Sequence, residues 1–433
     1  MAVTVPSPPD HSALGPCAVT FSATLAANET MEARRRRGEP VLPLGFGEAG
    51  LPVHPLLREA LARAAGCNRY GPVAGHGPLR AAAAAYWTRR GLPTGADAVV
   101  CGPGSKPLLY GLIAAIGGDV AIRRPSWVSY AAQASLAGHA AHFVPGPGGV
   151  PDAGLLDRAV RAARAAGRPI RSVIVTLPDN PTGTLAPPAA VGALCSVAEA
   201  HDLIVISDEI YRDLIHDPDT PFTSPSSLYP ERTVVTAGLS KHLALGGWRL
   251  GVARLPDGWL GRELRARLLG IGSEIWSAPA GPVQQAAALA FSEPAALTER
   301  VALSRRLHAS VARGVADRFA AAGVPVPPPQ AAFYLYPDFG PVANVLRERH
   351  GVTGDEGLAA LLLDRYGVAV LPGSAFGDEG GRLRLRVATA MLYGETDAQR
   401  TTALNSADPC SMPWIAGALS RLDEVLADLV SAS

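Results

Sequence analysis

Residues 172–208 are SVIVTLPDNPTGTLAPPAAVGALCSVAEAHDLIVISD. Two runs in this stretch, Val173 to Val175 and Leu203 to Ile206, are continuously apolar, and an Ala-rich helical segment separates them. Strands that are apolar on both faces are typical of parallel sheets covered by helices on both sides. The stretch therefore predicts an α/β fold, in which a mostly parallel sheet is flanked by helices.

The same alternation extends outward from this stretch. We expect strands at 98–101, 119–122, 141–144, 172–177 and 203–207, and helices at 79–87, 106–116, 128–136, 154–166 and 189–201. Further out, the patterns predict helices at 24–37, 294–321 and 414–430 and strands at 41–44, 332–336, 368–371 and 383–387, without strict alternation. This favours a second, smaller α+β domain. We expect a flexible tail at 1–23, a large domain at 46–299, and a small domain built from 24–45 and 300–433.

The composition excludes several classes of protein. A chain of 433 residues with 48% hydrophobic and 18% charged residues is typical of a globular protein with a large core. A net charge of +1 gives no reason to expect a nucleic acid or a membrane surface as partner. The five cysteines are scattered without metal-ligand or disulfide spacing, so no metal is expected. No signal peptide or membrane span is apparent, and a cytoplasmic location is expected.

Lysine is almost absent from the chain. All but two of the 39 basic residues are Arg, and the exceptions are Lys106 and Lys241. Arg cannot replace Lys where the chemistry requires a deprotonated amine or a Schiff base. A GC-rich coding sequence in which two lysines remain by chance would give the same composition. The sequences around the two lysines must therefore show whether either one is functional.

Several polar residues follow the predicted strands, where open α/β sheets bind their ligands. Asp208 comes directly after one buried strand, and Asn180 follows another in the sequence DNPTG. Taken singly, these residues could be a helix N-cap and an ordinary turn. The segment Gly102 to Lys106 joins a third strand to a helix, an arrangement that can bind a phosphate through backbone N–H groups.

The decisive segment is Gly238 to Lys241, which follows the apolar pair Val234-Val235. Arg249 stands eight residues after Lys241, within the sequence GWRLG. A lysine in a turn of small residues, with an arginine one short loop away, suits a Schiff-base lysine beside a phosphate anchor. In combination and in this order, the segments predict one complete cofactor site.

Together these stretches resemble the fold-type-I, class I/II aminotransferases of the aspartate aminotransferase family over about residues 24–430. The stretches that carry the resemblance are RYGP (69–72) with Gly75 and LR (79–80), GSK (104–106), PSW (125–127), NPTG (180–183), SDEIY (207–211), SK (240–241), GWR (247–249), AFY (332–334) and RL (384–385). The resemblance implies pyridoxal 5′-phosphate as cofactor and a homodimer as the assembly.

The resemblance also implies a role for each matching residue. Lys241 would hold the cofactor as an aldimine and then act as the base. Asp208 would keep the pyridine nitrogen protonated, while Asn180 and Tyr211 would bind the phenolic oxygen. Trp127 would stack on the ring, and both Trp127 and Asn180 would contact the substrate.

The remaining roles concern the phosphate and the substrate carboxylate. The phosphate would be surrounded by Gly104, Ser105, Lys106, Ser240 and Arg249, and Tyr70 would reach it from the neighbouring subunit. Arg384 would bind the substrate α-carboxylate with help from the backbone near Gly47. Arg382, Arg384 and Arg386 alternate along one predicted strand and would share a face, so the choice of Arg384 depends on the family pattern.

The chain departs from the family pattern at three places. Gly238 replaces the Ser or Thr that often stands three residues before the lysine, and Lys106 stands at a position that is not basic in many relatives. Residues 391–413 intervene before the last helix, where the family usually has only a few residues. We expect that Lys106 and this insertion together select a larger or more anionic substrate, with the insertion covering the pocket.

These observations favour an aminotransferase acting on an L-amino acid and a 2-oxo acid. The same residues would serve an alternative, a γ-elimination or γ-replacement enzyme similar to the aminocyclopropanecarboxylate synthases, with a sulfonium substrate of the S-adenosylmethionine type. A third class, non-catalytic regulators with this fold, carries a DNA-binding winged helix at the N-terminus. The few dozen residues before the matching region are expected to be too short for one.

Overall fold

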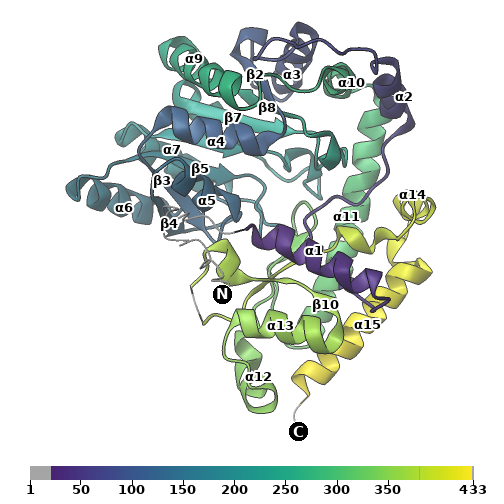
Figure 1. The fold of residues 1–433 in the computed structure, drawn as a ribbon. Coiled ribbons are helices and arrows are strands. Elements are labelled where there is room, and N and C mark those ends of the chain that lie inside the picture. The colour runs from purple at the N-terminus through teal and green to yellow at the C-terminus, as the bar shows by residue number, and fades with distance from the viewer. Residues whose placement is uncertain (1–20, 380, 432–433) are drawn as a thin grey trace, which may run out of the picture.

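A seven-stranded sheet forms the centre of the computed structural model, which describes residues 21–379 and 381–431 (Figure 1). Its order is β2-β8-β7-β6-β5-β3-β4. The strands are β2 (Val99–Gly102), β3 (Asp119–Arg124), β4 (Ala141–Pro145), β5 (Ile170–Thr176), β6 (Ile204–Asp208), β7 (Thr233–Gly238) and β8 (Gly251–Arg254). Only β8 is antiparallel to its neighbours, β2 and β7. The carboxyl ends of the other six strands therefore lie along one edge of the sheet.

Helices cover both faces of this sheet, as the apolar strands predict. The helices of this region are α2 (Pro55–Arg63), α3 (Gly77–Arg89), α4 (Ser105–Ile116), α5 (Ser129–Leu136), α6 (Ala153–Ala165), α7 (Pro188–Ala200), α8 (Pro225–Leu228), α9 (Gly258–Ile275) and α10 (Gly281–Ser292). Ile174 of β5 packs in a cluster with residues of α4, α5 and α9, whereas its neighbours Val173 and Val175 pack with α6 and α7. Alternate residues of one strand thus enter separate cores, and the α/β fold class is confirmed.

A second group of elements adjoins the sheet. It comprises α1 (Ala23–Arg36), β1 (Leu42–Pro43), α11 (Ala295–Ala321), β9 (Tyr334–Leu335), α12 (Ala343–His350), α13 (Asp355–Tyr366), β10 (Val368–Ala369), β11 (Leu371–Pro372), β12 (Leu385–Ala388), α14 (Asp397–Asn405) and α15 (Pro413–Val430). The strands form the pair β1-β10 and the sheet β11-β12-β9. Figure 1 shows α11 extending from α2 and α10 down to α15.

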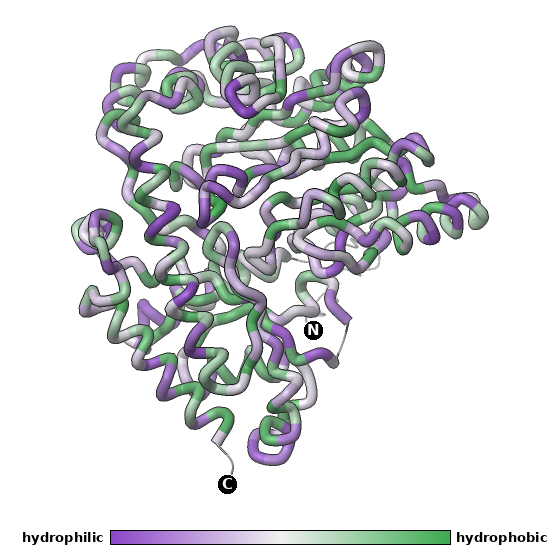
Figure 2. Tube along the Cα trace, turned by 180° about the vertical axis from the view of Figure 1, so that it is seen from behind, coloured by the Kyte–Doolittle hydropathy of each residue, from purple (hydrophilic) through white to green (hydrophobic). Residues whose placement is uncertain are grey.

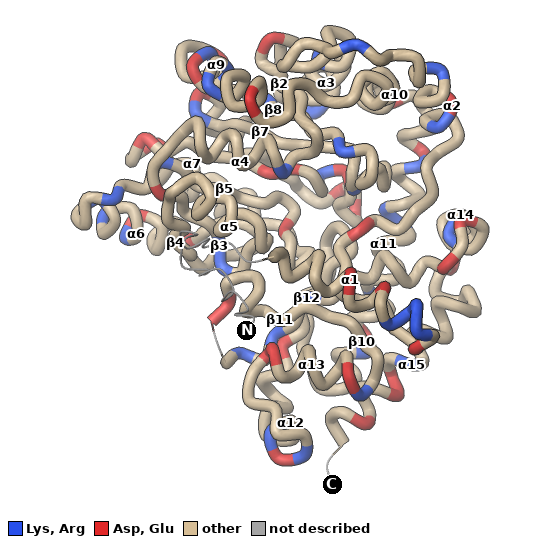
Figure 3. Tube along the Cα trace, in the orientation of Figure 1, with Lys and Arg blue, Asp and Glu red and all other residues tan. Residues whose placement is uncertain are grey.

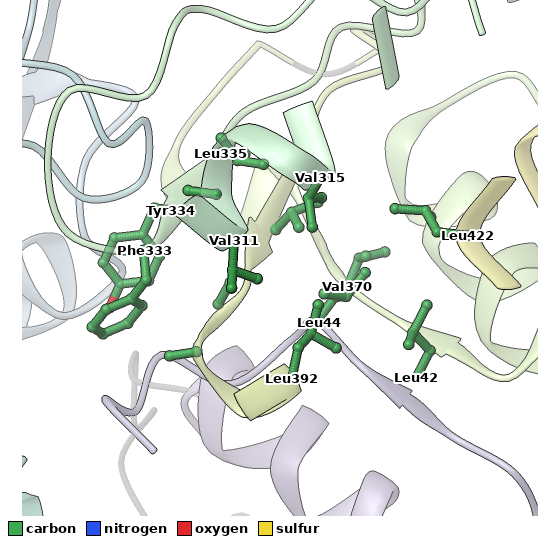
Figure 4. Packing of buried hydrophobic residues seen from close by; sticks show 14 of the residues in the cluster. Leu42, Leu44, Val311, Val315, Phe333, Tyr334, Leu335, Val370, Leu392 and Leu422 are labelled. Carbon is green, nitrogen blue, oxygen red and sulfur yellow. The ribbon is translucent and has the colours of Figure 1, made fainter. Parts of the chain in front are cut away.

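The second group has a core of its own. Leu44, Val311, Phe333, Val370 and Leu422 are buried together, although they come from distant parts of the sequence (Figure 4). The hydropathy view shows hydrophobic segments running through the interior, with hydrophilic ones on the outer turns (Figure 2). The N-terminal segment and the C-terminal third therefore fold together. The division of the chain into domains at 45/46 and 299/300 stays a prediction.

The elements expected from the sequence are present, with their ends shifted by a few residues. The patterns gave no expectation for α2, β8, α9, α10, α12, α13 or α14. Residues 1–20 of the expected tail lie outside the described residues. Within the described part of the chain, no helix combines the length and the apolar character needed to cross a membrane.

Candidate active site

A cavity of about 430 Å³ lies at the edge of the sheet where the parallel strands end. Ten of the residues predicted from the sequence line it, namely Gly47, Ser105, Lys106, Trp127, Asn180, Asp208, Tyr211, Ser240, Lys241 and Arg249. They come from separate turns that are spread along the chain from Gly47 to Arg249. Because β2, β5, β6 and β7 run in the same direction, their following turns meet at this edge.

Lys241 lies in the turn that follows β7. Its Nζ donates a hydrogen bond to the Gly47 carbonyl oxygen at 2.6 Å, and it lies 5.9 Å from the centre of the Tyr211 ring. No carboxylate lies within ion-pair distance of this amine in the described part of the chain. The lysine is therefore held by a neutral oxygen only, and its amine can move to another partner in the cavity.

Asp208 ends β6 at the bottom of the cavity. The Tyr130 hydroxyl donates to its Oδ2 at 2.9 Å, and the Thr236 hydroxyl donates to its Oδ1 at 3.1 Å. Burial raises the pKa of Asp208 to about 6, and these two hydrogen bonds act against that rise. A buried carboxylate with a raised pKa favours a positively charged partner, because a nearby cation stabilises its ionised form.

The start of α4 forms a second, positively charged end of the cavity. Gly104 has φ +100° and no side chain, which leaves room for the Arg249 guanidinium beside it. No side chain caps the helix there, so backbone N–H groups of its first turn remain available. Burial, followed by repulsion from Arg249 and Lys241, lowers the pKa of Lys106. Cations and a helix N-terminus in one place are suited to a phosphate group.

Asn180 and Tyr211 also line this cavity. The Asn180 side chain is buried, and its Oδ1 has no hydrogen-bond partner among the described residues. The Tyr211 hydroxyl lies 2.9 Å from the Tyr334 hydroxyl, and Tyr334 in turn donates to the Gly47 carbonyl oxygen at 3.4 Å. Buried polar atoms without partners are costly, so the Asn180 Oδ1 has capacity for one more hydrogen bond from a donor in the cavity.

The structure does not bring Arg384 into the cavity as expected, and its role toward the substrate stays a prediction. Arg384 lies outside the cavity, where its Nε donates to Asp338 at 2.8 Å and its Nη1 to Asp378 at 3.5 Å. Arg386 lines the cavity instead, with 1% of its surface exposed, no carboxylate partner and a buried Nε that lacks a hydrogen bond within the described chain.

The register of β12 explains the difference between these arginines. Val387 pairs with Leu335 and Ala388 with Tyr334, so Arg386 falls opposite Tyr336, two residues from the level of Tyr334, which lines the cavity. Arg384 pairs with Asp338 and lies two residues, about 7 Å, farther along the strand. The Arg386 guanidinium also contacts the Tyr334 ring, 5.2 Å from its centre, and donates to the Gly45 carbonyl oxygen.

Two further expectations concern residues outside the cavity. Tyr70 is 95% exposed and does not line the cavity, and its role in a neighbouring subunit stays a prediction. The expectation that residues 391–413 cover the pocket is wrong, because none of them lines it. They pack on α11 and α15 instead, where the Tyr393 hydroxyl bonds His308 at 2.6 Å and the Trp414 indole donates to the Tyr393 carbonyl oxygen at 2.9 Å.

The sequence reasoning also missed residues that line the cavity. Ser22, Thr24 and Leu25 from the start of α1 reach it, and Thr24 Oγ1 is buried without a partner among the described residues. Tyr130 and Tyr334 line it too. Tyr130 stands three residues after Trp127, a spacing that places both on one side of a helical turn and could have indicated it. No local signal places α1 beside the cavity.

Comparisons with known proteins agree with this geometry. The family described as aminotransferase class I and II matches residues 39–396. The aspartate/prephenate aminotransferase of Thermus thermophilus is 31% identical over 375 residues, which cover 85% of this chain and 92% of the relative. The aspartate aminotransferase of Geobacillus stearothermophilus is 32% identical over 395 residues, which cover 88% and 95%.

A solved structure extends the agreement to the fold. The aspartate aminotransferase from Thermus thermophilus with maleate superposes with a TM-score of 0.79 at 27% identity, covering 94% of this chain and 97% of that one. The matched region includes the strand ends that line the cavity. The chain therefore belongs to the class I and II aminotransferases, a family of pyridoxal-phosphate-dependent transferases of fold type I.

Proposed function

We propose that this protein binds pyridoxal 5′-phosphate and transfers the amino group of an acidic L-amino acid to a 2-oxo acid, with Lys241 as the residue that bonds the cofactor. The observation that carries this proposal is the meeting of Lys241, the buried carboxylate of Asp208 and the start of α4 in one cavity. When bound, the cofactor would supply an electron sink for the bond changes at the substrate α-carbon.

The residues present fit that cofactor. The N–H groups of α4, Ser105, Ser240 and Arg249 would hold the phosphate, next to the space left by Gly104. Asp208 would hold a proton on the ring nitrogen, and Tyr211 and the unpaired Asn180 would bind the phenolic oxygen. The Lys241 amine would carry the proton that leaves the substrate α-carbon.

We further propose that Arg386 binds the substrate α-carboxylate. Neither arginine of the cavity has a carboxylate partner in the described chain, but only Arg386 is fully buried and has an Nε without a hydrogen bond. Burial lowers the pKa of Arg386, and a bound anion would stabilise its charged form. Asn180 lies in the same cavity and would assist it. A buried guanidinium with free donors binds a carboxylate through charge-assisted hydrogen bonds.

A second carboxylate would bind between Lys106 and α1. The Lys106 amine lies 5.1 Å from the centre of the Trp127 ring, and Thr24 brings an unpaired hydroxyl into the same cavity. An ammonium and a hydroxyl in a cavity that already holds Arg386 favour a dicarboxylic substrate. The names of the relatives, aspartate and aspartate/prephenate aminotransferase, agree with this choice.

The test is the half-reaction of the purified holoenzyme with one amino acid at a time. With L-aspartate, we expect the visible absorption band of the bound cofactor to change and oxaloacetate to appear, about tenfold or more faster than the oxo acid from L-leucine. Lys106→Ala should remove most of this preference, and Lys241→Ala should abolish both the band change and turnover.

The comparison with S-adenosylmethionine tests the alternative chemistry. Release of a thioether from that compound, without formation of an oxo acid from any amino acid, would contradict the proposed transamination. Equal rates with aspartate and leucine would contradict the dicarboxylic substrate while leaving the aminotransferase intact.

A further inference from the structure

A second cavity, of about 380 Å³, adjoins the same two chain segments that carry Lys241 and Tyr211. His242 and Leu243, directly after the lysine, line it, as do Arg212 and Asp213, directly after the tyrosine. The two cavities share no lining residue. Its other walls come from residues 215–222, from the end of α10 and from the start of α11, which directly follows α10 in the chain (Figure 1). A molecule in the second cavity would therefore touch the peptides that position two active-site side chains.

Most charges in this second cavity are already paired. Arg90 Nη2 lies 2.8 Å from Asp213 and 2.5 Å from Glu293, and Arg212 Nη1 lies 3.0 Å from Glu209. Asp213 also accepts a hydrogen bond from the Tyr86 hydroxyl at 2.8 Å. The two carboxylates that line the cavity are therefore already paired with guanidinium groups, which disfavours an added ammonium ligand.

Arg305 is the exception. It lines the cavity and has neither an ion pair nor a side-chain hydrogen bond in residues 21–379 and 381–431. His242 is buried, which lowers its pKa, so it adds no charge at neutral pH. One uncompensated guanidinium in a half-closed cavity attracts a single negative charge, and its planar donors match a carboxylate. Figure 3 shows Lys and Arg interspersed with Asp and Glu over the elements of the molecule.

The rest of the wall is apolar and is aligned with that guanidinium. Leu297, Val301 and Arg305 follow one another at intervals of four along α11, so they lie on one face of the helix. That face extends over about 12 Å from Leu297 to Arg305. Phe222 and Leu243 face the same cavity. The cavity thus combines one unpaired cation, Arg305, with an apolar slot, which is the usual composition of a small-molecule site.

We propose that this second cavity is an effector site for a monocarboxylate with an aromatic or branched apolar body and no ammonium group. Its carboxylate would bind Arg305, and its body would lie along Leu297 and Val301 against Leu243. Binding would hold the segment 241–243 in one position and so change turnover. The effect on turnover rests on the proposed function, whereas the binding does not.

The first experiment is calorimetric titration of the cofactor-loaded enzyme with 3-phenylpropanoate. We expect Arg305→Ala to weaken binding by about tenfold or more, because the carboxylate loses its partner. Arg306→Ala is the matched control, since this neighbour is exposed and lies outside the cavity, and it should change binding by less than about twofold. Val301→Phe should block binding by filling the slot, and the neutral 3-phenylpropanamide should bind at least about tenfold more weakly than the acid.

Arg386→Ala separates the two cavities, because the probe could also enter the first one. Binding that is lost in Arg386→Ala and kept in Arg305→Ala would overturn the proposed site, and so would binding that is equal in Arg305→Ala and wild type. The second experiment measures kcat at saturating substrate with and without the probe. A change in kcat that disappears in Arg305→Ala supports regulation, and an unchanged kcat despite confirmed binding overturns it.

Discussion

Two arginines of the β12 segment, two residues apart, have opposite surroundings, and this difference leads to the first prediction. Arg386 is buried in the cavity without a carboxylate, whereas Arg384 already pairs with Asp338 and Asp378. We expect Arg386→Ala to lower kcat/KM for the amino acid by at least about tenfold, since a charge-assisted hydrogen bond contributes about 1.5–3 kcal/mol. Arg384→Ala should lower it by less than about threefold. Steady-state kinetics of the two variants test this prediction. A larger loss of kcat/KM in Arg384→Ala than in Arg386→Ala would identify Arg384 as the carboxylate ligand.

A second prediction at this scale concerns the hydroxyl of Tyr130. Its hydrogen bond lowers the pKa of Asp208, which burial raises to about 6, so its loss in Tyr130→Phe should raise that pKa further. The ionised carboxylate is the form that holds the ring-nitrogen proton, so activity is lost as the pH falls through this pKa. In the pH profile of kcat/KM, the acid limb should therefore shift to a pH about one unit higher.

The controls for Tyr130→Phe come from two other residues. Thr236→Val removes the other hydrogen bond to Asp208 and should move the limb in the same direction. Tyr110→Phe, on the same helix as Lys106 but outside the cavity, should leave the profile in place. An acid limb that stays at the same pH in both Tyr130→Phe and Thr236→Val would contradict the role of the Asp208 carboxylate.

At the scale of elements, the cavity depends on a close contact between β8 and the start of α4. A Cβ on Gly251 would collide with the backbone nitrogen of Ser105, which cannot move without displacing the helix. We expect Gly251→Ala to lower the free energy of unfolding by about 1–3 kcal/mol and to weaken cofactor binding. Urea unfolding and titration with the cofactor measure the two effects.

Gly192→Ala is the matched control for this contact. It lies within α7, and a Cβ there would meet open space. Alanine favours the helix over glycine, so this variant should gain up to about 1 kcal/mol and bind the cofactor unchanged. Equal losses in both variants would show that the contact between β8 and α4 is not the cause.

For the whole molecule, we propose that two subunits share each site through Tyr70. This tyrosine is almost fully exposed in the single chain, which is unusual for a large aromatic residue and favours a partner surface. If it enters the neighbouring site, mixing inactive Tyr70→Ala and Lys241→Ala subunits should restore about a quarter of the wild-type activity, because half of the random dimers hold one intact site. If activity does not recover after the subunits are mixed and refolded, Tyr70 does not contribute to the neighbouring site.

The sequence alone determined the type and order of most elements in the sheet, and it predicted that Lys241, Asp208 and Arg249 lie together, as they do around one cavity. These inferences depend on local patterns, since apolar runs specify buried strands and parallel strands must end at the same edge. Helices such as α9, α10 and α13 were missed because no regular alternation with predicted strands marks them in the sequence.

The tertiary structure decided what depends on contacts between distant segments. The choice of Arg386 over Arg384 follows from how β12 pairs with β9, a register that alternating arginines cannot reveal. The place of Thr24 in the same cavity as Lys106, and of residues 391–413 on α11 and α15, depends on how distant segments pack together. Such packing is governed by the shape of surfaces that are formed only when the elements have assembled, so no local pattern contains it.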